Sequence, residues 1–228
     1  MPSNLPTRWR HWWRIISAKA CRPAVAERRS YHHGNLRQAL VDATAALIEE
    51  LGPQAFTMSE AARRAGVSAA APYRHFRGRD DLIEEVARQG FLEFADRLEV
   101  AFDDGAPTVL TAFLRMGQAY LDFAGERPGF YMAMFESGIS IAGKSELSAA
   151  SDRAQGVLLR AADALASRMP KDRRPPSRMV ANHVWALSHG VVELFSRGKP
   201  GGRSSVEPSE MLESGVIIYL RGLGLIPN

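Results

Sequence analysis

Apolar residues recur at helical spacing along most of the 228-residue chain. The first clear run begins after Asn35, ends at Gly52, and has apolar positions at Leu36, Leu40, Ala43, Leu47, Ile48 and Leu51. Positions three and four apart share one face of an α-helix, so this pattern predicts an amphipathic helix over 35–51, with Asn35 as its N-cap. Further helices are predicted from Arg79 onward and over 107–125, 127–137, 147–169, 175–197 and 207–223, with Gly and Pro between them. No strand-like alternation bounded by turns occurs, so the predicted fold class is all-α.

Two shorter helices are predicted between the first run and Arg79. Thr57 is an N-cap candidate with Glu60 three residues later, the spacing of a capping box, and predicts a helix over Met58–Ala65 that stops at Gly66. Ser68 is then expected to cap a third helix from Ala69 to about Phe76, with Pro72 in its first turn or just beyond. Two short helices joined by a tight turn with glycine form a helix-turn-helix unit, in which the second helix enters the DNA major groove. We therefore predict a DNA-binding head over residues 31–80.

Several side chains of this head are candidates for DNA contact. Ser68 can cap a helix and meet a phosphate, and the methyl groups of Ala69, Ala70 and Ala71 allow close approach to thymine. Hydrogen-bonding partners for phosphates or bases are predicted at Thr57, Tyr73, Arg74, His75 and Arg79, and at His32 and His33 in an arm before the first helix. The alternative for Tyr73 is a core aromatic and for Arg74 a solvated charge, whereas Phe76 is expected in the core. No metal site is expected, because adjacent histidines without a nearby partner make poor ligands.

Charge separates the two ends of the chain. Residues 1–80 hold 13 Lys and Arg against 6 Asp and Glu, whereas residues 81–228 hold 16 against 19. A basic head and an acidic remainder are typical of a protein that binds a polyanion at one end. Residues 1–30 hold prolines and no consistent period, and are interpreted as a flexible basic extension.

Residues Thr57–Leu82, which read TMSEAARRAGVSAAAPYRHFRGRDDL, resemble the DNA-binding head of the TetR family of one-component regulators. That family often has Tyr-x-His-Phe, a short turn and a basic residue here, and Tyr73, His75, Phe76 and Arg79 match it. The resemblance extends over about 50 residues, from Tyr31 to Leu82. It implies a homodimer on a palindromic DNA operator that usually represses nearby genes, and it implies release of DNA when a small molecule shifts the long helix after Asp80. Three consecutive alanines leave the operator unpredicted and suggest specificity partly from DNA shape.

The C-terminal domain, residues 81–228, is predicted to bind a ligand and to dimerise. Trp185-Ala-Leu-Ser-His189-Gly190 resembles the Trp-His-Gly signature of one TetR subclass. The predicted dimer interface consists of helices 175–197 and 207–223, which from two subunits would form a four-helix bundle. The alternative is that helix 175–197 is an internal core helix of a monomer. Soft and aromatic residues suggest a pocket for an apolar or aromatic effector, although each also suits a helical core. The candidates are Phe113, Met116, Tyr120, Phe130, Met134, Phe135, Trp185 and His189.

Other functions have less support in the sequence. A single cysteine, no apolar run long enough for a membrane span and no secretory signal favour a cytoplasmic protein without a membrane partner. No catalytic, phosphate-loop or dinucleotide motif occurs, so neither enzymatic activity nor a cofactor is expected. Two alternatives stay open: an architectural or constitutive DNA-binding protein without a ligand, and a helical protein whose basic, Trp-rich N-terminus binds anionic membrane surfaces.

Overall fold

The computed structural model describes residues 36–196 and 206–227, and this part of the chain is helical with no strand. The predicted all-α fold class is therefore confirmed. The described helices are α2 (Leu36–Leu51), α3 (Met58–Arg64), α4 (Arg79–Phe102), α5 (Val109–Glu126), α6 (Pro128–Phe135), α7 (Ser145–Ala166), α8 (Ser177–Val191) and α9 (Pro208–Gly222). Short turns of other helix types lie at η1 (Pro72–Arg74), η2 (Asp103–Gly105), η3 (Lys171–Arg173) and η4 (Val192–Ser196, a π-helix). The predicted N-cap Asn35 and the predicted extension 1–30 lie outside the described residues.

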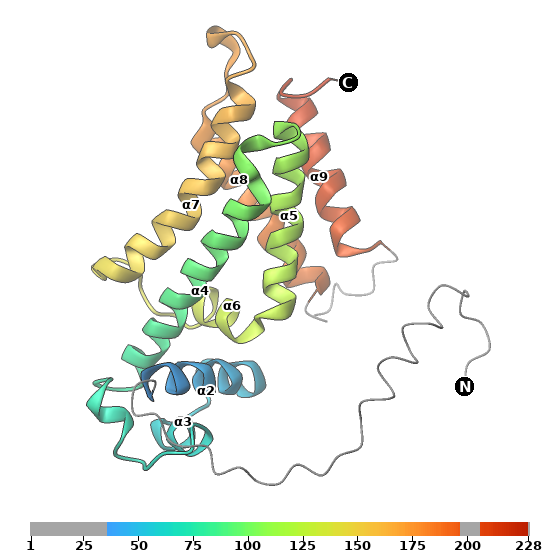
Figure 1. Ribbon diagram of the computed structural model, residues 1–228. Coiled ribbons are helices and arrows are strands. Elements are labelled where there is room, and N and C mark those ends of the chain that lie inside the picture. The colour runs from blue at the N-terminus through green and yellow to red at the C-terminus, as the bar shows by residue number, and fades with distance from the viewer. Residues whose placement is uncertain (1–35, 197–205, 228) are drawn as a thin grey trace, which may run out of the picture. The chain divides into compact units, whose positions relative to one another are not determined.

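The N-terminal head is formed by α2, α3 and η1, with α2 lying across the lower end of α4 (Figure 1). Helix α2 ends where Gly52 adopts a positive φ of 86°, which favours glycine. Helix α3 begins at the predicted capping box: the backbone N–H of Glu60 donates to Oγ1 of Thr57 at 3.2 Å, and the backbone N–H of Thr57 donates to Oε2 of Glu60 at 2.8 Å. These two bonds satisfy N–H groups that the helix leaves without partners, which explains the start of α3.

The predicted third helix, Ala69–Phe76, is wrong as an α-helix. Residues 69–71 form turns, and a 3-10 helix follows over Pro72–Arg74. In an α-helix that begins after Ser68, the first regular bond would run from the N–H of residue 72 to the carbonyl of Ser68. Proline has no N–H and its ring crowds that carbonyl, so the segment closes with bonds from Ala71 to Ser68 and from His75 to Pro72. Pro72, which was expected in the first turn of an α-helix or just beyond it, therefore changes the helix type.

The C-terminal body is built around α4, which packs against α5, α6 and α7. Figure 1 shows α4 rising from the head between α7 and α5, while α8 and α9 lie beside α5 and α7. One face of α4 is buried along its length, including Leu82, Val86, Phe91, Phe94 and Leu98. The predicted helices 107–125, 127–137, 147–169 and 207–223 match α5, α6, α7 and α9 with end residues shifted by one to three positions. The predicted helix 175–197 corresponds to α8, which begins at Ser177, followed by the π-helical turn η4.

The head contacts the body at several places, and two of them involve α2 directly. Gly129 in the first turn of α6 lies so close to α2 that a Cβ added to it would stand 2.0 Å from the carbonyl oxygen of Ala45. The second place is the carboxylate of Glu85 on α4, which is 5% exposed and lies 3.1 Å from Arg37 of α2 and 2.8 Å from Arg88. Burial alone favours the protonated carboxyl, but hydrogen bonds from Arg88 and Gln89 and the two guanidinium charges hold the pKa of Glu85 below its ordinary value. Both contacts couple the position of the head to that of the body.

Candidate functional site

The segment between α3 and α4 presents a row of exposed side chains over a buried support. Ser68, Ala69 and Ala70 are exposed, and Ala71 is half-buried. In the next turn Tyr73 is 59% exposed, and Arg74 and His75 are also exposed. Two residues of the same segment point inward, because Pro72 is buried and Phe76 is only 2% exposed. The expectation that Phe76 belongs to the core is confirmed, and Tyr73 is a surface residue rather than a core aromatic.

The buried ring of Phe76 fixes this row against the rest of the head. The guanidinium carbon of Arg37 on α2 lies 5.1 Å from the centre of the Phe76 ring, in cation–π geometry. The carbonyl of Pro72 accepts the backbone N–H of Phe76 at 3.0 Å. The exposed side chains of the row therefore stand on a segment whose inner side is held by the core.

Thr57 and Arg79, two other predicted DNA contacts, are engaged inside the head. The hydroxyl of Thr57 donates to Oε2 of Glu60 at 2.9 Å. This bond and the bond from the backbone N–H of Thr57 lower the pKa of the Glu60 carboxyl. Nε of Arg79 donates to the carbonyl of Phe56 at 3.1 Å, and Nη2 donates to the carbonyl of Pro53. Arg79 thus ties the start of α4 to the loop between α2 and α3, and its contact with DNA stays a prediction.

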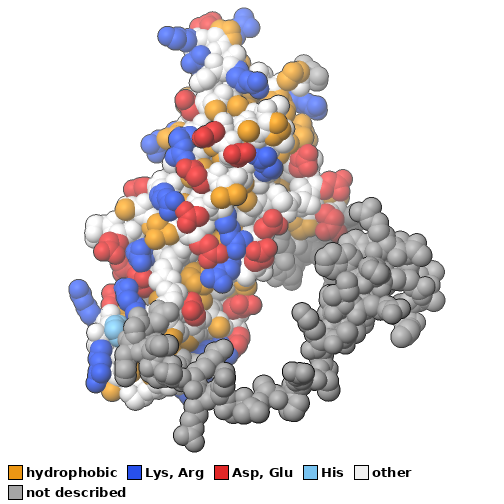
Figure 2. All heavy atoms as spheres, viewed as in Figure 1, with side chains coloured by type: hydrophobic (Ala, Val, Ile, Leu, Met, Phe, Trp, Pro, Cys, Tyr) orange, Lys and Arg blue, Asp and Glu red, His pale blue; other side chains and the backbone are white. Residues whose placement is uncertain are grey.

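Arg77 is a cation of this surface that the sequence analysis did not select. It is exposed, and neither Arg74 nor Arg77 forms an ion pair with another described residue. Figure 2 shows Lys and Arg side chains at the lower left, over the segment between α3 and α4. The signal was present in the sequence as a basic residue directly after the Tyr-x-His-Phe motif.

The larger share of the basic charge lies elsewhere. Residues 1–35 carry 7 Lys and Arg against 1 Asp or Glu, and they lie outside the described residues together with His32 and His33. The described part of the head, residues 36–80, carries 6 against 5. The electrostatic attraction of the head to a polyanion therefore depends mostly on the N-terminal residues.

The predicted pocket residues of the body divide into a packed core and a cavity wall. Five of them are at most 7% exposed and belong to one continuous core cluster: Phe113, Met116, Tyr120, Phe130 and Met134. The other three, Phe135, Trp185 and His189, are half-buried and line an open cavity of about 470 Å³. Gln155, Asn182, Ala186 and Gly190 complete its lining.

His189 connects this cavity to the core. Its Nδ1 atom lies 2.8 Å from the hydroxyl of Tyr131 and 3.1 Å from the hydroxyl of Tyr120. Tyr131 is fully buried and Tyr120 is 2% exposed, and burial raises the pKa of Tyr120, so the Tyr120 phenol is neutral at physiological pH. The rings of Tyr131 and His189 are stacked, with centres 5.7 Å apart. A molecule that contacts His189 in the cavity would therefore contact a member of a buried hydrogen-bond cluster, which includes Tyr131 of α6.

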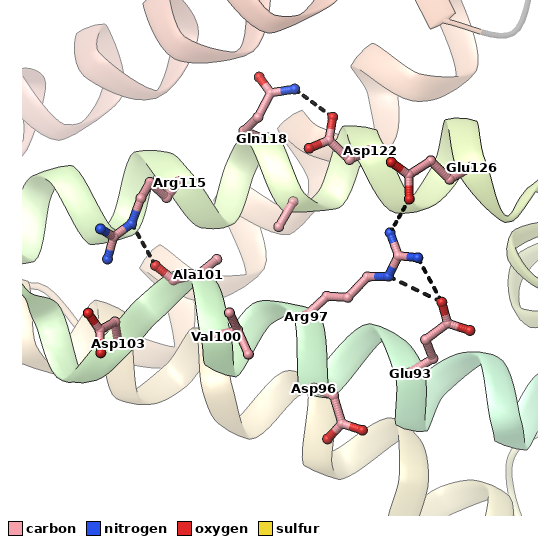
Figure 3. Close-up of a pocket in the computed structure, with 11 residues that line it drawn as sticks. Glu93, Asp96, Arg97, Val100, Ala101, Asp103, Arg115, Gln118, Asp122 and Glu126 are labelled. Carbon is pink, nitrogen blue, oxygen red and sulfur yellow. Dashed lines mark hydrogen bonds and ion pairs between the residues drawn. The ribbon is translucent and has the colours of Figure 1, made fainter. Parts of the chain in front are cut away.

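A second hollow, of about 640 Å³, lies between α4 and α5 (Figure 3). Its polar groups bond to each other: Arg97 bridges Glu93 and Glu126 at 2.8 and 2.7 Å, Gln118 donates to Asp122, and Arg115 donates to the carbonyl of Ala101. Its one large exposed apolar side chain is Val100, at 80% exposure. This hollow is an open groove on the outside of two helices, and its charged side chains are paired with each other.

The outer sides of α8 and α9 carry apolar side chains that no described residue covers. Leu187 on α8 is 37% exposed, Leu194 in η4 is 53% exposed and Ile218 on α9 is 70% exposed. The two helices pack against each other, and Nδ1 of His183 lies 2.9 Å from the hydroxyl of Tyr219 between them. This face, defined by Leu187, Leu194 and Ile218, falls within the two segments predicted as the dimer interface.

Residues 36–196 and 206–227 contain no candidate for a metal site or for a membrane-spanning helix. No group of three or more His, Cys, Asp or Glu side chains in this part is placed to hold a metal ion. None of its helices combines the length and apolarity that crossing a membrane requires.

Two family models match the chain in the regions just described. The model of bacterial regulatory proteins of the TetR family matches residues 40–86, which contain α2, α3, η1 and the start of α4. The model of the tetracycline repressor-like C-terminal domain matches residues 113–217, which include the cavity and most of the α8 and α9 face. The chain belongs to the TetR family.

Two curated relatives are similar to part of this chain. The HTH-type transcriptional regulator BetI 2 of Chromohalobacter salexigens is 38% identical over 74 residues, which are 31% of this chain and 36% of that protein. The uncharacterized HTH-type transcriptional regulator YobS of Bacillus subtilis is 26% identical over 100 residues, which are 44% of this chain and 51% of that protein. The chain thus spans about half, or less, of the curated relatives it matches.

The fold of this TetR family member also resembles solved structures over most of its length. A protein of unknown function from Rhodococcus sp. RHA1 has a TM-score of 0.72 at 25% identity, covering 85% of this chain and 98% of that chain. The TetR family transcriptional regulator PfmR of Thermus thermophilus has a TM-score of 0.63 at 18% identity, covering 80% and 97%. At such identities, the second likeness shows the fold alone.

Proposed function

We propose that this TetR family protein is a cytoplasmic, homodimeric transcription regulator. It binds a palindromic operator as a repressor, and an effector that binds to its body releases it from the DNA. The observation that carries the proposal is the exposed row Tyr73, Arg74 and His75 standing on the buried Pro72 and Phe76. Exposed hydrogen-bonding side chains on a rigid helical turn are the arrangement with which helix-turn-helix proteins read a major groove. The protein acts by binding DNA, not as an enzyme.

Dimerisation would place two such rows on one DNA molecule. The α8 and α9 face of two chains can form a four-helix bundle around a two-fold axis, and the exposed Leu187 and Ile218 would then be buried. A two-fold protein binds half-sites about 34–36 Å apart, one turn of DNA, on the same side of the duplex. The Trp-His-Gly subclass stays a prediction from the residues Trp185, His189 and Gly190.

An effector in the body would act on the head through α6 and α4, which both contact α2. Helix α6 contributes Phe135 to the cavity and Tyr131 to the buried cluster, and it touches α2 at Gly129. Helix α4 starts next to the DNA-reading row and holds α2 through Glu85. A ligand that binds one arrangement of α6 and α4 more tightly than another raises the population of that arrangement, and the difference in affinity sets the size of the change. The heads then take the positions that this arrangement requires. A shift of a few ångströms in head separation would prevent both heads from docking.

The experiment that tests DNA reading uses purified full-length protein and fragmented genomic DNA at near-physiological salt, followed by sequencing of the retained fragments. We expect enrichment of a short palindrome, as two-fold binding requires. Uniform retention that disappears with added salt would show phosphate binding without sequence reading and would contradict the proposal.

Two variants test the row itself. Tyr73→Ala and Arg74→Ala should each weaken binding to the enriched sequence by about 1–3 kcal/mol and leave thermal stability unchanged, because both side chains are exposed. Arg173→Ala is the matched control, since it removes the same charge from an exposed position of the body. Equal weakening by Arg74→Ala and Arg173→Ala would mean that only net charge matters.

A constitutive DNA-binding protein without an effector is the second candidate. The observation that favours it is the close packing of the five core residues that the sequence analysis had assigned to a pocket. Measuring operator release in the presence of a small-molecule library separates the two candidates. A constitutive protein would bind the operator equally with and without every compound.

A further inference from the structure

The cavity beside His189 limits the chemistry of the molecule that it can hold. Its volume of about 470 Å³ lies in the usual range of small-molecule sites, roughly 300–1,000 Å³. None of its lining residues is Asp, Glu, Lys or Arg. A charged ligand would find no opposite charge in this lining, so the lining favours an uncharged molecule.

Aromatic rings form the apolar wall of this cavity. The ring of Phe135 stands nearly perpendicular to that of Trp185, with centres 6.1 Å apart and an interplanar angle of 82°. It meets the ring of His189 in the same manner, with centres 5.1 Å apart and an angle of 71°. Perpendicular rings offer both faces and edges, which are the surfaces that a flat aromatic molecule prefers to contact.

His189 adds one polar group to the aromatic wall. Its Nδ1 atom faces the buried hydroxyls of Tyr131 and Tyr120, whereas its Nε2 atom has no hydrogen-bond partner among residues 36–196 and 206–227. The ring is half-buried and lines the cavity. A hydroxyl group both donates and accepts, so it can pair with Nε2 whichever nitrogen carries the proton.

We infer that the effector is an uncharged, flat aromatic molecule that packs against the exposed sides of the Phe135 and Trp185 rings and has a hydroxyl group that bonds to Nε2 of His189. This inference rests on the proposed effector-controlled regulation and adds the chemical class of the effector to it. The amide groups of Gln155 and Asn182, which also line the cavity, are available for a second oxygen of such a molecule.

Three probes of similar shape test this chemistry on the full-length protein by equilibrium dialysis at pH 7. They are 2-naphthol, 2-methylnaphthalene, which replaces the hydroxyl by a methyl group, and 2-naphthoate, which adds a negative charge. We expect 2-naphthol to bind about fivefold more tightly than 2-methylnaphthalene, although it is the less apolar of the two, because one net hydrogen bond has that effect. We expect 2-naphthoate to bind more weakly than both.

Substitution of His189 then assigns the hydrogen bond. His189→Phe keeps a ring and removes both nitrogens, so the preference for 2-naphthol over 2-methylnaphthalene should disappear. If that variant does not fold because the hydrogen bond between Tyr131 and His189 is lost, the double variant Tyr131→Phe with His189→Phe removes both groups of that bond. Val100→Ser in the groove between α4 and α5 is the control and should keep the wild-type preference, since Val100 lies outside the cavity.

Three results would overturn the inference: none of the probes binds, 2-naphthoate binds best, or the preference for 2-naphthol persists without His189. Retention of genomic DNA is measured on the same preparations. Sequence-specific retention without probe binding would refute the inference alone, whereas probe binding without sequence-specific retention would refute the proposed regulator and leave the site.

Discussion

Gly129 offers the sharpest test of how the head is attached to the body. A Cβ at this position would stand 2.0 Å from the carbonyl oxygen, 2.7 Å from the carbonyl carbon and 3.2 Å from the Cα of Ala45. All three are backbone atoms in the middle of α2, so no side chain can turn away to make room. For Gly129→Ala, α2 and α6 would have to separate by more than about 1 Å to reach the closest distances that real Cβ atoms show.

The expected cost is large for a single methyl group. Overpacking costs about 1–3 kcal/mol where side chains can adjust, and we place Gly129→Ala at about 3 kcal/mol because the obstacle is backbone. For a chain of this size each kcal/mol changes Tm by roughly 2–4 °C, so Tm should fall by about 6–12 °C. Folded molecules should also bind the operator more weakly, since α2 carries the rest of the head.

Gly125→Ala is the matched control. Gly125 lies in α5, and an added Cβ there meets nothing within 4 Å. Alanine is favoured over glycine inside a helix by about 1 kcal/mol, so this variant should be slightly more stable than the wild type. Thermal and denaturant unfolding of both variants, with operator binding of each, measure the contrast. If Gly129→Ala were as stable as Gly125→Ala and bound DNA normally, the close contact between α6 and α2 would be refuted.

Three further predictions concern the head, its joint to the body and the dimer. Thr57→Ala should destabilise the protein by about 1 kcal/mol at neutral pH by removing the N-cap. Because the hydrogen bonds of Thr57 lower the pKa of Glu60, the difference in unfolding free energy should shrink as the pH falls below the ordinary glutamate value of 4.5, and a constant difference would argue against the capping box. Glu85→Gln should cost about 1–3 kcal/mol at neutral pH, because it removes the buried carboxylate that Arg37 and Arg88 share. The pKa of Glu85 is lowered in the folded protein, so this loss of unfolding free energy should be complete above pH 4.5 and fade in acid, as urea unfolding at several pH values would show. Ile218→Asp should convert the proposed dimer to a monomer in sedimentation velocity experiments, whereas a dimer that persists in this variant would place the interface elsewhere.

Much of the helical order could be predicted from the sequence because it depends on local rules. The period of apolar residues in 36–51 follows from the geometry of one helix face, and the structure has α2 there. The capping box at Thr57 and Glu60 is likewise a contact between residues three apart. Such features need no knowledge of distant segments.

The segment after Ser68 was predicted less well because a single backbone group decided it. The pattern of Ser68 followed by alanines favours an α-helix, but the missing N–H of Pro72 falls where the first regular helical bond is needed. The exposure of Tyr73 and the burial of Phe76 then depend on where α2 and α4 lie, which places Phe76 beneath Arg37.

The pocket shows the limit of composition as a guide. Met116 and Tyr120 have the residue types of a ligand pocket, yet they pack into the core, while Trp185 and His189 line the open cavity. Gln155 and Asn182 were not selected, because a polar residue on a helix gives no local sign that it faces a cavity. Which apolar residues are packed and which are left uncovered is set by the separation of helices, not by the helices themselves.

The sequence by itself determined the helices, the capped turn of the head and the family resemblance, since each rests on contacts among neighbouring residues or on matched motifs. Only the tertiary structure decided that Gly129 meets Ala45, that Glu85 joins α2 to α4, and that His189 meets Tyr131 and Tyr120. These contacts join residues that are far apart in the chain and depend on how whole helices pack, which no local pattern specifies.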